Sequence, residues 1–187
     1  MPRAGLDTEG VVDAAARLAD AEGLEAVTLA RLASTLGVRA PSLYVHVEGL
    51  KDLHLRLAVR GSTQLTEQLQ QAATGRAGAD ALHAIAHAYR DYAQAHPGLY
   101  RALQRAPEDE RSKAAAEKLV GVVLAVLRGY GLTEDDAIHA TRVIRAALHG
   151  FVTLEATGGF GYPLALEESY ARLVRVLDRG LRRQEQA

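Results

Sequence analysis

The most informative spacing of polar and charged side chains lies between Thr28 and Val47, in the run TLARLASTLGVRAPSLYVHV. Short helices are expected at 29–36 and 40–47, because Thr28 is a good N-cap and Gly37 can end the first helix in a left-handed conformation. The side chains that the core does not need are Arg39, Ser42, Tyr44, Val45 and His46. Such side chains can reach base edges and phosphates when a short helix enters the major groove of DNA.

The charge of the chain favours nucleic acid only locally. The formal net charge of the whole chain is −1, which by itself predicts no attraction to DNA. Residues 28–60, however, contain only Glu48 and Asp52 as carboxylates, against five cations: Arg31, Arg39, Lys51, Arg56 and Arg60. A local excess of positive charge is what contact with phosphates requires.

The elements around this segment are expected to be helical throughout, because apolar residues recur with the helical period and strand-like alternation is rare. Helices are expected at 7–22, 29–36, 40–47, 51–71, 80–95, 99–104, 107–130, 134–156 and 164–183. The apolar segment 119–127 should lie in the middle of the helical body. The sequence therefore predicts an all-α fold, with a helix-turn-helix DNA-binding domain at 1–50 and an effector-binding and dimerisation domain at 51–187.

Several classes of function are disfavoured by composition. The chain has no cysteine, so disulfides, thiolate metal sites and cysteine nucleophiles are excluded. We find no nucleophile–base pair or paired carboxylates, and we predict neither catalytic residues nor a cofactor. No signal peptide is recognised, and the longest apolar run is too short to cross a bilayer, so a cytoplasmic location is expected.

The run T-L-A-R-L-A-x-x-L-G-V-x-A-P-S-L-Y-x-H-V resembles the DNA-binding signature of the tetracycline-repressor (TetR) family, and the resemblance covers residues 9–60. It implies that Thr28 caps its helix and contacts a phosphate, and that Arg39, Ser42 and Val45 address base edges or the phosphates beside them. It also implies that Tyr44 and His46 pack against or hydrogen-bond the DNA backbone, and that Lys51 contacts a flanking phosphate.

This sequence departs from the family pattern at Arg39, where a small hydroxyl residue is common, and at Leu50, where the family often has its lysine. A second, local resemblance is Leu148-His149-Gly150, which resembles a family subgroup with an L/W-H-G motif in its C-terminal domain.

The resemblance further implies a homodimer that binds a near-palindromic operator, usually as a repressor, and that responds to a small molecule. In the family the last two helices pair with their copies, and the apolar stripes here suggest an interface of Ile144, Leu148, Phe151, Tyr170, Leu173 and Leu177. Position and polarity suggest that the effector site is lined by His83, His87, Tyr89, Tyr92, Leu103, Leu124, Arg128 and Arg145.

Two alternatives remain open at this point. Asp80, His83 and His87 share one helix face at a spacing that can hold a divalent metal, which would make the protein a metal-responsive regulator. A fourth ligand is not evident, and a polar stripe explains the pattern more simply, so no metal site is predicted. The other alternative is a helical small-molecule carrier with helix-turn-helix-like geometry.

Overall fold

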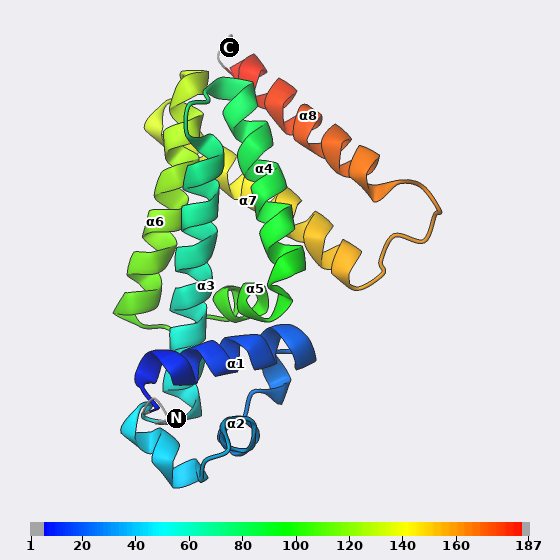
Figure 1. Ribbon diagram of the computed structural model, residues 1–187. Coiled ribbons are helices and arrows are strands. Elements are labelled where there is room, and N and C mark those ends of the chain that lie inside the picture. The colour runs from blue at the N-terminus through cyan, green and yellow to red at the C-terminus, as the bar shows by residue number, and fades with distance from the viewer. Residues whose placement is uncertain (1–5, 185–187) are drawn as a thin grey trace. The chain divides into compact units, whose positions relative to one another are not determined.

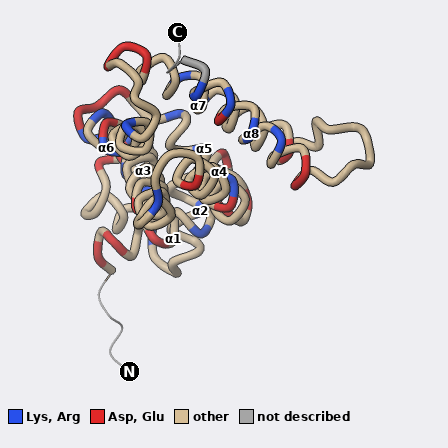
Figure 2. The backbone as a smooth tube through the Cα atoms, turned by 90° about the horizontal axis from the view of Figure 1, so that it is seen from above, with Lys and Arg blue, Asp and Glu red and all other residues tan. Residues whose placement is uncertain are grey.

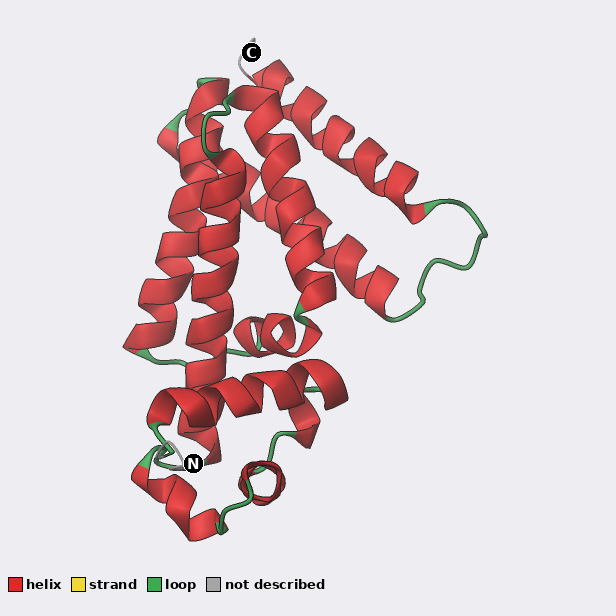
Figure 3. Ribbon diagram, viewed as in Figure 1, coloured by secondary structure: helices red, strands yellow, loops and turns green. Residues whose placement is uncertain are grey.

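The computed structural model describes residues 6–184, in which all regular structure is helical (Figures 1 and 3). The first part contains α1 (Thr8–Glu22), η1 (Leu24–Ala26), α2 (Leu29–Leu36), η2 (Ala40–Val45) and α3 (Leu50–Ala73), where η denotes a 3-10 helix. The rest contains α4 (Gly78–Ala95), α5 (Pro97–Gln104), α6 (Glu110–Leu127), η3 (Arg128–Tyr130), α7 (Glu134–Ala156) and α8 (Leu166–Gln184). The all-α prediction is confirmed.

The described chain divides into two compact units. The first comprises residues 6–64 and Ala95–Ala116, and the second comprises Leu65–Gln94 and residues 117–184. The expected boundary at residue 50 does not coincide with this division, because α3 contributes to both units and α5 joins the first unit. The assignment of DNA binding and effector binding to the two parts of the chain stays a prediction.

The first unit is organised around α1. Asp7 caps this helix, since its Oδ1 accepts a hydrogen bond of 2.8 Å from the amide of Gly10. The core beneath it consists of aliphatic side chains with no exposed surface: Val11, Ala15, Leu32, Leu43, Leu53 and Leu57. This core joins α1, both short helices and the start of α3, so the helix-turn-helix is held by apolar burial.

The helix α5 packs against α1 in the same unit. Asp20 Oδ1 accepts hydrogen bonds from the amides of Gly98 (2.9 Å) and Leu99 (3.0 Å), the first residues of α5 with free N–H groups. A Cβ at position 98 would lie 2.1 Å from the carbonyl carbon of Ala19, so only glycine allows this approach. The sequence predicted the helix but not its partner.

The second unit contains α4, α7 and α8 and the larger part of α6. The helices α7 and α8 lie side by side and are joined by an extended loop (Figure 1). Buried tyrosines connect them to their neighbours: Tyr170 donates a 2.6 Å hydrogen bond to the carbonyl of Ala86 in α4, and Tyr130 donates one of 2.8 Å to Asp178 Oδ1 in α8. Cationic segments recur along α8 (Figure 2).

Arg90 forms an internal ion cluster in this unit. Its guanidinium, only 9% exposed, bonds both carboxylate oxygens of Glu155 at 2.9 and 2.6 Å and also pairs with Glu167. The guanidinium carbon lies 5.0 Å from the ring centre of Tyr170. The hydrogen bond to Glu155 raises the pKa of Arg90, and the same contact lowers the pKa of Glu155. Both groups are therefore held in their charged forms.

The sequence predicts that the apolar segment 119–127 lies in the middle of the helical body, but only part of it is buried. Val122, Val126 and Leu127 are buried, but Val120 is 38% exposed and Gly121 is also exposed. One side of α6 thus faces the core and the other faces solvent. Within the described residues, no helix is both long and apolar enough to cross a membrane.

Candidate nucleic-acid interface

The first helix of the pair, α2, has a defined start and end. The hydroxyl of Thr28 accepts a 3.1 Å hydrogen bond from the amide of Arg31, as the N-cap prediction requires. Gly37 ends the helix at φ +67°, and the amide of Val38 bonds back to the carbonyl of Ala33 at 3.0 Å. Open space surrounds the position of a Cβ at residue 37, so it is the left-handed backbone that requires glycine there.

The second short helix, η2, is a 3-10 helix from Ala40 to Val45, whereas an ordinary helix over 40–47 was expected. A 3-10 helix has three residues per turn, so residues three apart lie in one row. One row faces the core: Leu43 is fully buried, and Ala40 and His46 are half-buried on either side of it. His46 is therefore partly an anchor of the helix, although the sequence suggested that it points outward.

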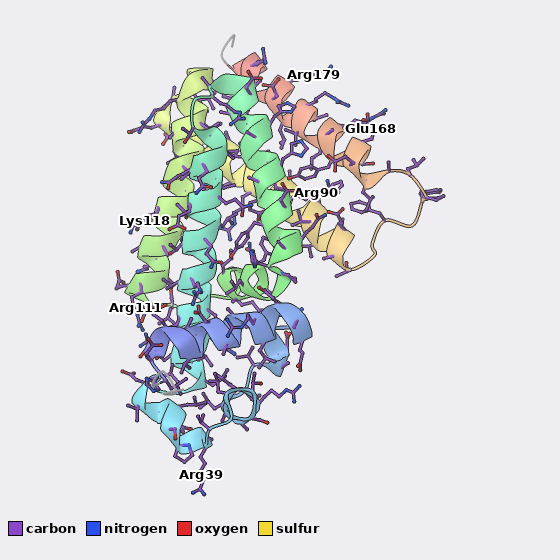
Figure 4. The ribbon with its side chains drawn as sticks, viewed as in Figure 1. Arg39, Arg90, Arg111, Lys118, Glu168 and Arg179 are labelled. Carbon is purple, nitrogen blue, oxygen red and sulfur yellow. The ribbon has the colours of Figure 1, made fainter. Side chains whose placement is uncertain are left out.

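The opposite row carries the side chains predicted to meet DNA. Arg39, Ser42 and Val45 are all exposed, and Val45 is 83% exposed. Tyr44, beside this row, is 60% exposed. The side chain of Arg39 extends away from the helices into open space (Figure 4). We call Arg39, Ser42 and Val45 the outer row.

Lys51 lies in the first turn of α3, close in sequence to η2, and is exposed. Its neighbour Asp52 fixes this turn: Oδ2 accepts from the Arg56 guanidinium at 2.8 Å and from the Glu48 amide at 3.3 Å, and Arg111 lies 3.5 Å from Oδ1. Burial alone would raise the pKa of Asp52, but these contacts outweigh it and the pKa is lowered. The ionised carboxylate therefore holds the helix start that presents Lys51.

The local excess of positive charge is smaller than the sequence suggested. Arg31 pairs with Glu22 at 2.8 Å, Arg56 pairs with Asp52, and Arg60 pairs with Asp13 of α1. Carboxylates of α1 and α3 thus neutralise one cation of α2 and two cations of α3. Arg39 and Lys51 remain as exposed cations beside the recognition helix.

The eight residues predicted to line an effector site are not brought together. Tyr89 and Tyr92 are buried in α4, His83 and His87 are half-buried there, and Arg145 is exposed on α7. Leu103 belongs to α5 and hence to the other unit.

Two of the eight do share a cavity. Leu124 and Arg128 line a space of about 450 Å³ with residues 132–135, 137 and 138 at the start of α7. A second cavity, of about 520 Å³, lies between α6 and the turn that joins α3 to α4, and its cations are Arg76 and Lys118. No pattern in the sequence predicts this second cavity, because it depends on the packing of α6 against that turn.

Most residues of the predicted dimer interface are buried within the single chain, and the interface stays a prediction. Ile144, Leu148, Phe151 and Tyr170 have at most 9% of their surface exposed, so they offer little area to a second copy. Leu173 and Leu177 are half-buried. The helical period identifies an apolar stripe, but it does not say whether that stripe faces the body of the protein or a partner.

The metal alternative finds no support in the structure. Among residues 6–184, no group of three or more histidine, aspartate or glutamate side chains is placed to hold a metal ion. Of the three residues of this stripe on α4, Asp80 is exposed, and His83 and His87 are half-buried.

Two family models match the chain. Residues 11–47 match the model described as bacterial regulatory proteins, tetR family, and residues 82–177 match the model described as tetracyclin repressor-like, C-terminal domain.

Three curated relatives match most of the chain. The uncharacterized HTH-type transcriptional regulator YobS of Bacillus subtilis is 41% identical over 96% of this chain and 95% of its own length. The uncharacterized HTH-type transcriptional regulator Rv0681 of Mycobacterium tuberculosis is 40% identical over 83% of this chain and 72% of its own. The HTH-type transcriptional repressor DrrR1 of Streptomyces coeruleorubidus is 33% identical over 76% of this chain and 51% of its own length.

Solved structures share the fold at low sequence identity. A protein of unknown function from Rhodococcus sp. RHA1 has a TM-score of 0.81 at 22% identity, covering 96% of this chain and 98% of that one. BioQ with its double-stranded DNA operator has a TM-score of 0.70 at 20% identity, covering 95% and 99%. The TetR-Q116A variant from Acinetobacter baumannii AYE with minocycline has a TM-score of 0.73 at 21% identity, covering 98% and 100%.

The helix pair, with α2 capped by Thr28, agrees with the family that these matches identify, and so does the expectation that the chain is no enzyme. The chain belongs to the TetR family of bacterial regulatory proteins, which are helix-turn-helix transcriptional regulators that bind DNA.

Proposed function

We propose that the protein is a ligand-responsive repressor that acts in the cytoplasm as a homodimer on a near-palindromic operator. The observation that carries this proposal is the outer row: Arg39 at the N-cap of η2, and Ser42 and Val45 on η2, are exposed, whereas Leu43 of the same helix is buried in the core. A short helix held from one side, with an exposed row on another side, is suited to the major groove.

Repression and operator binding are supported by relatives. DrrR1 is named a repressor, and BioQ, which has the same fold, was solved with its operator. A homodimer would set the two η2 helices about one DNA turn apart, or somewhat more, and the operator would repeat the two-fold symmetry. We also keep the subgroup assignment from Leu148-His149-Gly150 as a proposal.

The dimer face that we now propose lies on the solvent side of α7 and α8. Val143 is 58% exposed and Leu154 47% exposed on α7, and Val176 is 65% exposed on α8. Gly150 and Gly180 have open space where a Cβ would stand, so a second helix can approach them closely. Leu173 and Leu177 of α8 are half-buried, so part of each side chain is available to the same contact.

For the effector we propose the cavity of about 450 Å³ at the start of α7. Its size is in the range of small-molecule sites, and it combines apolar leucines with the guanidinium of Arg128. TetR of the same fold was solved with minocycline, which makes a small organic effector reasonable here. A coupling of about 1–3 kcal/mol between effector and operator would be typical.

Selection of bound sequences from a random duplex library tests this function. The wild-type chain should enrich one two-fold-symmetric motif, and Arg39→Ala and Tyr44→Ala should lose or relax it. Lys118→Ala is the matched control, because it removes an exposed cation that lies outside the first unit. Enrichment of no motif by the wild type, or equal loss in the control, would contradict the proposal.

A further inference from the structure

The most exposed large apolar side chain of the recognition helix is Val45, which is 83% exposed at the end of η2. Its packing is not required by the fold, since the buried row of this helix runs through Leu43. An exposed apolar side chain gains no hydrophobic stabilisation, because that stabilisation comes from removing apolar surface from water. A single exposed valine is common on protein surfaces, but this one shares the outer row with Ser42 and Arg39, so a duplex bound to that row would cover it.

The chemistry of the major groove limits what that surface can be. Every base edge there presents hydrogen-bond donors or acceptors, and only thymine also presents a methyl group. Valine has no donor or acceptor, so it can distinguish bases only through apolar contact. We infer that Val45 recognises the C5-methyl group of a thymine in each half of the operator, which deepens the function proposed above and rests on it.

The 3-10 geometry also gives the place of this thymine. Residues three apart in such a helix are separated by about 6 Å along the axis, because each residue rises about 2.0 Å. Ser42 and Val45 are three apart in the outer row, and successive bases on one strand are about 3.4 Å apart. The thymine therefore lies about two base-pair steps from the base that Ser42 addresses. In an ordinary α-helix the same two residues would be only about 4.5 Å apart along the axis, because each residue rises about 1.5 Å.

The test exchanges one methyl group on the DNA and one side chain on the protein. Each thymine of the selected operator is replaced in turn, in both half-sites, by deoxyuridine, which lacks only the C5-methyl group. Equilibrium affinities at one fixed salt concentration are measured for the full-length wild type and for Val45→Ala. Val120→Ala serves as control, since Val120 is an exposed valine on α6, outside the helix-turn-helix.

Removing the methyl group of one particular thymine in each half-site should weaken wild-type binding about fourfold for each half-site. This is the size expected for one buried methyl group. That loss should disappear in Val45→Ala and persist in Val120→Ala. The inference would be overturned, while operator binding itself stands, if deoxyuridine weakens wild-type binding at no thymine. It would also be overturned if Val45→Ala loses as much affinity as the wild type when the thymine is replaced. A wild type that prefers no sequence would overturn both this inference and the proposed function.

Discussion

At the scale of single residues, Arg39 and Lys51 have different expected roles although both are exposed cations beside η2. Arg39 belongs to the outer row, where the N–H donors of its planar guanidinium can reach base edges. Lys51 lies in the first turn of α3, held in place by the ion pairs of Asp52, where a point charge can meet a phosphate. Their substitution should therefore affect specificity and salt dependence, respectively.

Lys51→Ala should weaken binding to all duplexes by a similar factor and leave the preferred motif unchanged. The slope of log K against log salt concentration should become shallower by about one unit per half-site, because one phosphate contact is lost. Fluorescence anisotropy titrations at several salt concentrations measure this slope. Lys118→Ala should leave it unchanged, and a changed motif in Lys51→Ala would assign the lysine to base readout instead.

The ion pair of Arg90 and Glu155 predicts a pH dependence of stability. The contact with Arg90 lowers the pKa of Glu155 below its ordinary value of 4.5. The carboxylate therefore contributes its full stability above about pH 4.5, and this contribution is lost as the pH falls through the lowered pKa. Glu155→Gln should cost about 1–3 kcal/mol at neutral pH.

Urea unfolding of wild type and Glu155→Gln between pH 3 and pH 7 measures this effect, provided that both proteins unfold reversibly. The difference in the free energy of unfolding should be constant from about pH 6 to pH 7 and should shrink below about pH 4.5, since protonation then removes the charge in the wild type as well. A difference that stays constant down to pH 3 would contradict this role of the carboxylate.

At the scale of elements, the turn of the helix-turn-helix depends on Gly37, whose φ is +67°. Gly37→Ala should destabilise the protein by about 1–2 kcal/mol, because a Cβ is strained in this conformation even though nothing surrounds it. Gly121→Ala is the matched control in the exposed side of α6, where the same change should stabilise by about 0.5–1 kcal/mol.

Unfolding midpoints measure the change in stability that each substitution causes. A lower midpoint for Gly37→Ala and a higher one for Gly121→Ala would establish that the left-handed turn causes the loss of stability at position 37. Equal signs would mean that helix propensity or local packing decides both positions. Operator affinity should fall more in Gly37→Ala than in Gly121→Ala, since only the former change lies between α2 and η2.

Local signals in the sequence predicted most of the elements. Thr28 and Thr133 each cap a helix as expected, accepting hydrogen bonds from Arg31 and Asp136. The 3-10 form of η2 was not predicted, because hydrogen bonds to i−3 and to i−4 suit almost the same short sequence. The exposure of Arg39, Ser42 and Tyr44 could be predicted because the core of the helix pair is local.

Features that depend on distant contacts could not be predicted from the sequence. The approach of α5 to α1 rests on Asp20 and Gly98, which are 78 residues apart. The burial of Tyr170 rests on a carbonyl 84 residues away, at Ala86. Periodicity located the apolar stripes of α7 and α8, but their orientation followed only from such contacts.

At the scale of the whole molecule, the proposed repressor requires two chains, because one recognition helix reads only half of a symmetric operator. The exposed apolar side chains of α7 and α8 predict where the chains meet. Val176 is 65% exposed on α8, and the open position at Gly180 lies one helical turn away on the same side. Val176→Glu would place a charge next to its own copy or in an apolar contact across a two-fold interface, which is costly in either case.

The wild-type chain should sediment as a dimer at micromolar concentration, whereas Val176→Glu should sediment as a monomer with an unchanged helical circular dichroism spectrum. Val120→Glu, which adds the same charge to an exposed position of α6, should remain a dimer. Operator affinity should fall steeply in Val176→Glu, because the two half-sites are then bound independently and the gain from linking them is lost. A dimer that survives Val176→Glu would place the interface elsewhere, and a monomeric wild type that binds the full operator tightly would refute the two-fold mechanism itself.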